Sequence, residues 1–320
     1  MHASAMQECG TNIEGMSWES ALSAEGKTFL VTGASAGIGY FAAEQLAAHG
    51  ATVVLGCRDS GKADIAIGAI RSRVPNARLR SVRMDLADLS SLPATVDALG
   101  ADSLDAVVLN AGILLSGPER HLSPQGYELT FATNYLGHFA LVARLAPLLA
   151  ATANSRVITV GSHAARTERL DLTDLQSERD YRSKRTYGRS KLAQMLFGFE
   201  LDRRLRARGA DIASVVVHPG GALDALTPSR PPLFVRTTAQ RLRGLPAGLV
   251  LHGKHAGAEV ITRAVLDPVV TGGQLCGPRV FGLRGKPHRE TPRRHMTDPT
   301  VAGRLWTATT DLTGLDPFGG

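Results

Sequence analysis

The sequence predicts an α/β fold, a single doubly wound parallel sheet of about seven strands with helices on both faces. From residue 27 onward, short β-branched apolar runs alternate with longer stretches rich in Ala and Leu. The short runs are continuously apolar, as expected of parallel strands that are covered on both faces. No Pro- or Gly-rich linker divides the series, so one domain is predicted.

Seven runs are predicted as strands, the last of them weakly patterned: residues 29–32, 53–55, 79–84, 106–109, 156–160, 214–217 and 274–280. Residues 38–49, 134–150 and 187–208 have the length and composition of helices. The domain is assigned to 27–281, after a polar, flexible extension over 1–26. Residues 222–255 contain four prolines and scattered arginines and are predicted as an insertion after the sixth strand. The tail over 282–320 is expected to be mostly loop with one short helix.

Composition excludes several classes of protein. The 320 residues are 43% hydrophobic and 20% charged, which excludes a disordered chain. The net charge of +7 would suit an anionic ligand, but no block of five or six like charges indicates nucleic acid. No apolar window approaches the roughly 20 residues of a membrane span. Cys9, Cys57 and Cys276 form neither a disulfide framework nor a metal-binding pattern, so we expect no metal and a cytoplasmic location.

A glycine-rich turn follows the first predicted strand and opens a helix. It reads Thr32-Gly33-Ala34-Ser35-Ala36-Gly37-Ile38-Gly39. Glycines at such a turn let the backbone approach a pyrophosphate, whose charge is stabilised at the helix N-terminus. An ordinary strand-to-helix turn is the alternative for an isolated run of this kind. Its place after the first strand of a doubly wound pattern favours nucleotide binding.

The end of the second strand indicates which nucleotide is bound. A site for NAD usually has an acidic residue here for the ribose hydroxyls, whereas a 2′-phosphate requires Arg. Cys57 occupies the place of the acid, Arg58 follows it, and Lys62 lies one turn further on. A guanidinium can hold a phosphate with two hydrogen bonds. NADP(H) is therefore the predicted cofactor; the alternative is that Arg58 is a surface residue paired with Asp59.

Three further groups follow later strands, at the edge where such sheets bind ligands. Asn110, Ala111 and Gly112 follow the fourth strand and Ser162 follows the fifth. Tyr187 and Lys191 then lie one turn apart on one face of a helix. A phenol with a pKa near 10 is a poor base at neutral pH, and a neighbouring ammonium favours the phenolate. This order of groups predicts proton transfer at a site beside the nucleotide.

In these motifs the chain resembles the short-chain dehydrogenase/reductase family over residues 27–219, which implies a Rossmann-fold catalytic domain. The resemblance implies that Gly33, Gly37 and Gly39 line the pyrophosphate, that Asp85 and the adjacent Leu86 meet the adenine, and that Asn110 stabilises the central strand beside the cofactor. It implies that Asn134 bends its helix and holds a water in a proton relay, that Ser162 orients the substrate oxygen, that Tyr187 is the acid/base and that Lys191 binds the nicotinamide ribose. Pro219 and Gly220 match the loop that borders the nicotinamide.

Finer resemblance points to the branch of retinol dehydrogenases, protochlorophyllide reductases and WW-domain oxidoreductases. Its marks are residues 56–59, the run Asn134-Tyr135-Leu136-Gly137-His138-Phe139 and the long segment before Tyr187. Within this run His138 is expected to be a packed helix histidine, not a ligand. One departure concerns Asp224, which stands where the family usually has a Thr that binds the cofactor. Either Thr227 substitutes for it or the loop takes another path.

These observations predict an NADP(H)-dependent oxidoreductase that acts on a carbonyl or alcohol, with residues 222–255 as a mobile lid over a bulky, apolar substrate. A fixed helical cover is the alternative for the lid. An NADP-sensing regulatory protein and a carbon–carbon double-bond reductase of the protochlorophyllide reductase type are the alternative functions. A homo-oligomer is compatible with the sequence, which carries no specific signal for it.

Overall fold

The computed structural model describes residues 22–319, so most of the predicted extension over 1–26 lies outside the described residues. The strands of the described chain are β1 (Thr28–Thr32), β2 (Thr52–Cys57), β3 (Arg78–Arg83), β4 (Ala106–Leu109), β5 (Ser155–Val160), β6 (Ile212–Val217), β7 (Ala222–Leu223), β8 (His252–Gly253), β9 (Leu275–Val280) and β10 (Arg284–Glu290). The helices are α2 (Gly37–Ala48), α3 (Ser60–Arg71), α4 (Leu92–Asp97), α5 (Leu129–Phe131), α6 (Gly137–Ala150), α7 (Ser183–Ala207), α8 (Thr238–Gly244), α9 (Lys254–Leu266) and α10 (Pro299–Thr313).

Eight strands form the main sheet of the described chain, in the order β10-β9-β6-β5-β4-β1-β2-β3. All neighbours pair in parallel except β10, which runs antiparallel to β9. The predicted doubly wound sheet is therefore confirmed, with one strand more than the seven expected. Strand order reverses between β1 and β4, which is where such sheets bind ligands beyond the carboxyl ends of their strands.

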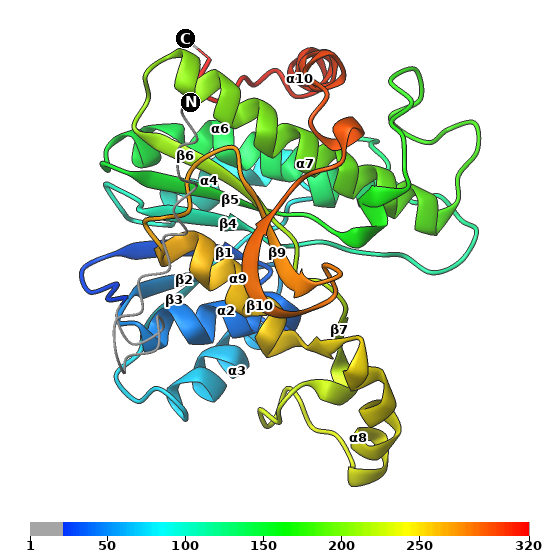
Figure 1. The fold of residues 1–320 in the computed structure, drawn as a ribbon. Helices are drawn as coiled ribbons and strands as arrows, with labels where there is room; N and C mark the ends of the chain where they lie inside the picture. Colours follow the sequence, from blue (N-terminus) through cyan, green and yellow to red (C-terminus); the bar gives the residue numbers. More distant parts are fainter. Residues whose placement is uncertain (1–21, 320) are drawn as a thin grey trace, which may run out of the picture.

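Helices cover both faces of the sheet, as Figure 1 shows, with α6 and α7 on one side and α2, α3 and α9 on the other. Successive strand residues point to opposite faces. In β1, Phe29 and Val31 join the core under α2, whereas Leu30 joins the core under α6 and α7. This two-sided burial explains why the strands read as unbroken apolar runs.

Residues 282–319 contain more regular secondary structure than the sequence indicated. The eighth strand, β10, lies in this segment, and α10 packs against α7. Trp306 of α10 is 3% exposed and stacks on Phe197 at 5.6 Å between ring centroids. Sequence patterning misses β10 because its run Arg-Gly-Lys-Pro-His-Arg-Glu is polar, as an edge strand with little burial allows.

Residues 222–255 form β7, α8 and β8 with short 3-10 turns between them, and β7 pairs with β8. Figure 1 shows this segment, with α8, projecting from one end of the molecule. Its base contacts α2: Arg230 pairs with Glu44, and Phe234 packs against Phe41 at 5.0 Å between centroids. No helix within residues 22–319 is both long and apolar enough to cross a membrane.

Candidate active site

The predicted cofactor residues lie along the carboxyl ends of β1, β2, β3, β4 and β6, so the fold gathers them at one edge of the sheet. At the end of β1, the turn into α2 uses two glycines with positive φ, Gly33 at 67° and Gly37 at 62°. A Cβ on Gly33 would lie 2.9 Å from the Cα of Ala111, so the turn packs against the segment after β4. Only glycine fits this position without displacing its neighbours.

The start of α2 suits an anion. Its N-cap residue, Ala36, makes no side-chain hydrogen bond to the first turn, so the cap leaves the N–H groups there without a side-chain acceptor. A Cβ on Gly37 would meet no atom within 4 Å, which shows that the turn is open on this side. Ser35 lies beside Cys57, because the two side chains hydrogen bond. A pyrophosphate placed here would meet backbone N–H groups and the positive end of the helix dipole.

Cys57 is 2% exposed, and burial raises the pKa of its thiol, so it is neutral at physiological pH. Arg58 and Lys62 are exposed, and neither forms an ion pair within residues 22–319. Asp59 caps α3 by accepting a hydrogen bond from the N–H of Lys62 at 3.0 Å. The Arg58 guanidinium is thus free to meet a ligand, and the Asp59 carboxylate is engaged elsewhere.

Asn110 joins the ends of β1 and β4. Its side-chain amide donates to the Thr32 carbonyl at 2.8 Å, and its backbone N–H donates to Thr32 Oγ1 at 2.9 Å. Asp85 accepts a hydrogen bond from the N–H of Ala87, and Leu86 is buried against the start of α6. Beyond β6, Pro219 accepts a hydrogen bond from His252, and Gly220 has a φ of 71°. The predicted cofactor residues that follow β3, β4 and β6 therefore lie at this same edge of the sheet.

The predicted catalytic groups converge beside β5. Ser162 follows this strand directly, and its hydroxyl hydrogen bonds with Tyr187 of α7. Burial raises the pKa of Tyr187, and the bond with Ser162 offsets this only in part, so the phenol keeps its proton at neutral pH. Lys191 is 4% exposed and donates to the Val160 carbonyl at 3.0 Å. Burial lowers the pKa of Lys191 to about 8.

Asn134 lies in a π-helical turn, Ala132–Leu136, between α5 and α6. Such turns are uncommon and often mark functional sites. Its side chain accepts a hydrogen bond from the Ile113 N–H at 2.8 Å and donates to the Ile113 carbonyl and to Ser190 Oγ. The side chain thus connects the segment after β4 to α7. Its role in holding a relay water stays a prediction.

A second buried polar group at this edge consists of Thr32, His138 and Gln194. Sequence reasoning did not single out Gln194, although it lies three residues after Lys191 and hence on the same helix face. Gln194 Oε1 accepts a hydrogen bond from Lys191 Nζ at 2.9 Å. His138 is fully buried, and burial lowers its pKa to about 3, so the ring is neutral.

Asp224 and Thr227 lie in the loop after β6, where the sequence departs from the usual pattern. Thr227 is buried; its hydroxyl donates to the Leu223 carbonyl and accepts from the Lys254 N–H at the start of α9. Asp224 pairs with Lys254 at 2.5 Å and with Arg236 at 3.0 Å. Both side chains are therefore engaged within the protein, and the choice between the two expectations stays a prediction.

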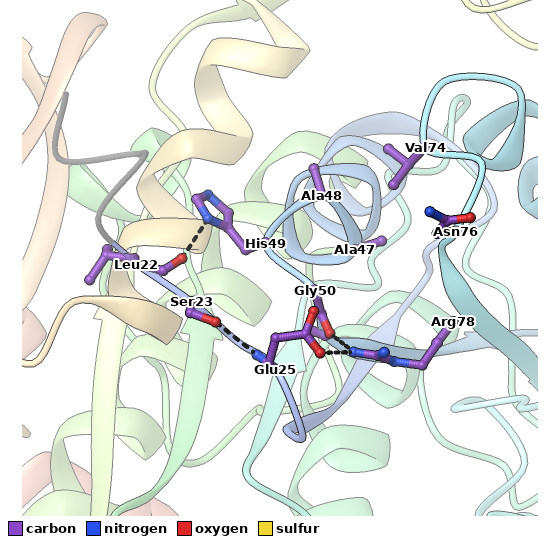
Figure 2. Close-up of a pocket in the computed structure, with 11 residues that line it drawn as sticks. Leu22, Ser23, Glu25, Ala47, Ala48, His49, Gly50, Val74, Asn76 and Arg78 are labelled. Atoms are coloured by element: carbon purple, nitrogen blue, oxygen red, sulfur yellow. Dashed lines mark hydrogen bonds and ion pairs between the residues drawn. The ribbon is translucent and has the colours of Figure 1, made fainter. Parts of the chain in front are cut away.

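A cavity of about 520 Å³ lies at the opposite end of the sheet, between the end of α2 and the starts of β2 and β3. Figure 2 shows its walls, where Arg78 pairs with Glu25 at 2.7 Å and also donates to the Gly50 carbonyl. His49 there hydrogen bonds to the Leu22 carbonyl at 2.8 Å. None of the residues that line it belongs to the predicted site, and doubly wound sheets bind ligands at the other edge.

Comparisons with known proteins agree with this geometry. Residues 27–230 match the model of the family described as short chain dehydrogenase. Mouse retinol dehydrogenase 13 is 33% identical over 293 residues, which cover 91% of this chain and 84% of that protein. Human WW domain-containing oxidoreductase is 37% identical over 206 residues, which cover 62% of this chain and 49% of that protein. A crystal structure of an uncharacterised protein from Mycobacterium paratuberculosis has a TM-score of 0.74 and 31% identity, and the match covers 93% of this chain and 97% of that one.

Proposed function

The chain belongs to the short-chain dehydrogenase/reductase family, and on this premise we propose that it transfers hydride between NADP(H) and a carbonyl or alcohol group of a bulky, apolar substrate. One observation carries the proposal. Ser162, Tyr187 and Lys191 lie together at the sheet edge where the uncapped N-terminus of α2 opens. Groups that can transfer a proton thus share one edge with a site for the pyrophosphate of a dinucleotide. This arrangement suits a reaction in which the dinucleotide transfers a hydride and the protein transfers a proton.

The residues present fit a dinucleotide. Two glycines with positive φ and the free N–H groups of α2 would hold the pyrophosphate. Arg58, which has no ion-pair partner within residues 22–319, would hold a 2′-phosphate, and neutral Cys57 adds no repulsion. When bound, the nicotinamide would exchange a hydride with the substrate carbon. NADP(H) is preferred over NAD(H) because no acidic side chain stands at the end of β2 to accept from the ribose hydroxyls.

In the reductive direction, Ser162 and Tyr187 would donate hydrogen bonds to the substrate oxygen. As negative charge develops there, Tyr187 gives its proton to that oxygen. A phenol whose pKa is raised by burial is fully protonated at neutral pH and so is ready to act as the acid. The Lys191 ammonium, buried beside it, stabilises the phenolate that remains. Asn134 connects the segment after β4 to α7 by hydrogen bonds, which helps to hold α7, and with it Tyr187 and Lys191, in position.

The substrate class is inferred from residues 222–255. Several large apolar side chains of this segment are exposed: Val235, Leu242, Leu245, Leu249 and Val250. Since Arg230 and Phe234 are attached to α2, we place the movable part of the lid at 235–250. Closure over a bulky apolar molecule would bury these side chains and exclude water. The names of the relatives, retinol dehydrogenases among them, support an apolar alcohol or aldehyde. A cytoplasmic location stays a prediction.

The proposal is tested by NADPH consumption against a panel of ketones, aldehydes, quinones and polycyclic carbonyl compounds. We expect turnover of the bulkier, apolar members and loss of turnover in Tyr187→Phe. Tight binding of NADPH without turnover of any member would favour an NADP-sensing protein instead. Product analysis separates carbonyl reduction from double-bond reduction, because only the first yields an alcohol.

A further inference from the structure

Gln194 lies one turn after Lys191 on α7, and both side chains are buried at the edge of the sheet that holds the candidate site. We propose that Gln194 is a positioning residue for Lys191, whose carboxamide fixes the ammonium and keeps it charged. The inference rests on the proposed function, in which the charged Lys191 serves Tyr187 and the cofactor ribose.

Two acceptors fix the ammonium of Lys191. One is the Val160 carbonyl at 3.0 Å, which belongs to the end of β5; the other is Gln194 Oε1 at 2.9 Å. An ammonium has three N–H donors, so one remains for a partner in the site. The Val160 carbonyl is held by the strand. Gln194 is therefore the acceptor that a side-chain substitution can remove.

The orientation of the Gln194 carboxamide follows from its neighbours. Its Nε2 donates to the Leu109 carbonyl at 3.0 Å, at the end of β4. Turning the amide over would place its oxygen against this carbonyl and its NH₂ group against the Lys191 ammonium. Both contacts would then be repulsive. The Leu109 carbonyl thus forces the amide oxygen toward Lys191.

His138 of α6 lies beside this amide and donates its Nδ1–H to the Asn134 carbonyl. Its Nδ1 lies 3.1 Å from Gln194 Nε2 and 3.0 Å from the Asn134 carbonyl, and its Nε2 lies 3.0 Å from Thr32 Oγ1. Thr32 Oγ1 in turn accepts from the N–H groups of Asn110 and Ala111, each at 2.9 Å. The Lys191 ammonium is therefore connected, through the buried side chain of Gln194, to the end of β4, which the predicted cofactor residues Asn110 and Ala111 follow.

This arrangement has a consequence for the charge of Lys191. Burial alone disfavours the ammonium, and the pKa of about 8 puts its loss just above physiological pH. The titratable groups beside it are Tyr187, one turn earlier on α7, and His138 from α6, which is neutral. Asn134 of the π-helical turn and Gly112 after β4 lie against it without charge. The acceptor at position 194, together with the Val160 carbonyl, then favours the charged form.

Lysine titration in the protein without cofactor tests the proposal directly. The chain has six lysines, so a ¹³Cε NMR spectrum contains only a few lysine signals to distinguish. The Lys191 signal is assigned as the one that is lost in Lys191→Met. In Gln194→Met, which keeps length but removes the acceptor, we expect the Lys191 midpoint to fall by about one pH unit. In Gln194→Glu, a carboxylate replaces the amide oxygen, and we expect the midpoint to rise. The alkaline limb of kcat/KM for carbonyl reduction should move in the same two directions.

Gln45→Met is the matched control. Gln45 is also a helix glutamine held by two hydrogen bonds, to the His255 carbonyl and from Thr262, but it lies on α2. It should leave the Lys191 midpoint unchanged. A Lys191 midpoint that stays constant in both Gln194 variants, or that moves the same way in both, overturns the proposal. If Gln194→Met does not fold, the rise in Gln194→Glu decides alone. If neither variant folds, a wild-type Lys191 midpoint below pH 7, which would leave the amine uncharged at physiological pH, overturns the proposal. Absence of NADPH turnover would count against the proposed function only, since the titration needs no cofactor.

Discussion

Arg230 forms a two-point ion pair with Glu44, Nε to Oε2 at 2.6 Å and Nη2 to Oε1 at 2.8 Å. The pair joins the base of the segment after β6 to the helix that opens at the glycine turn. Both side chains are largely buried, and Tyr40 also donates to Glu44 at 3.1 Å. The candidate lid is thereby fixed to the candidate cofactor helix at one end.

Arg230→Met should lower the free energy of unfolding by about 3 kcal/mol or more, because it leaves the Glu44 carboxylate buried without its cation. Urea denaturation measures this change. Arg182→Met, which removes an exposed pair with Asp180, is the control and should leave stability nearly unchanged, because water screens the pair. Cleavage within residues 222–255 by a protease should become faster in Arg230→Met. An unchanged cleavage rate would show that the pair does not hold the lid.

Wild type should prefer NADPH over NADH by roughly ten- to a hundredfold in kcat/KM, as a charge-assisted phosphate contact of about 1.5–3 kcal/mol implies. Cys57→Asp combined with Arg58→Ala should remove or invert this preference. Arg304→Ala, an exposed arginine on α10, is the control and should keep it. A preference that survives the double substitution would disprove the assigned role of Arg58.

Substitutions of the catalytic groups should separate chemistry from binding. Tyr187→Phe should abolish turnover and leave NADPH affinity nearly intact, because it removes the acid but no main cofactor contact. Ser162→Ala should lower kcat strongly with the same small effect on binding. Lys191→Ala should impair both. Steady-state kinetics and NADPH fluorescence titration measure the two quantities, and substantial turnover in Tyr187→Phe would exclude it as the acid.

Glu290 of β10 should make stability depend on acid pH. It contacts His218 at 3.0 Å and Arg166 at 2.9 Å. Burial would raise its pKa, but these partners outweigh burial, and the pKa is lowered. A lowered pKa in the folded state adds stability above the unfolded value, near 4.3, and this is lost as pH falls through the folded value.

Glu290→Gln should therefore cost about 1–3 kcal/mol at pH 7 and flatten the decline in stability below about pH 5. Urea denaturation between pH 3 and 8 measures both effects. Glu178→Gln, at a carboxylate that is 70% exposed, is the control. An equally steep acid decline in Glu290→Gln would assign the effect to other carboxylates.

Most of the fold could be predicted from the sequence because burial on both faces leaves a strong local signal. The strand that begins at residue 29 carries apolar side chains on both of its faces. The turn at Gly33 and Gly37 follows this strand directly. Strand β10 could not be predicted, since its edge position removes the need for apolar side chains, and its pairing with β9 is a tertiary contact. A short helix was expected in the tail, but its position and its length of 15 residues could not be predicted, because its sequence is rich in Thr and its packing on α7 stabilises it.

The sequence by itself determined which chemistry-bearing residues stand at strand and helix ends: the glycine turn, Arg58, Ser162, and Tyr187 with Lys191. The identity and order of these residues can be found directly in the sequence, and the parallel topology of the sheet places them at one edge. Only the tertiary structure decided what each side chain contacts. It turned Asp224 toward Lys254 and Arg236, and it joined Gln194 to Lys191. Such pairings depend on how α6, α7 and α9 pack on the sheet, and a buried hydrogen bond between distant segments leaves no period or spacing in the chain.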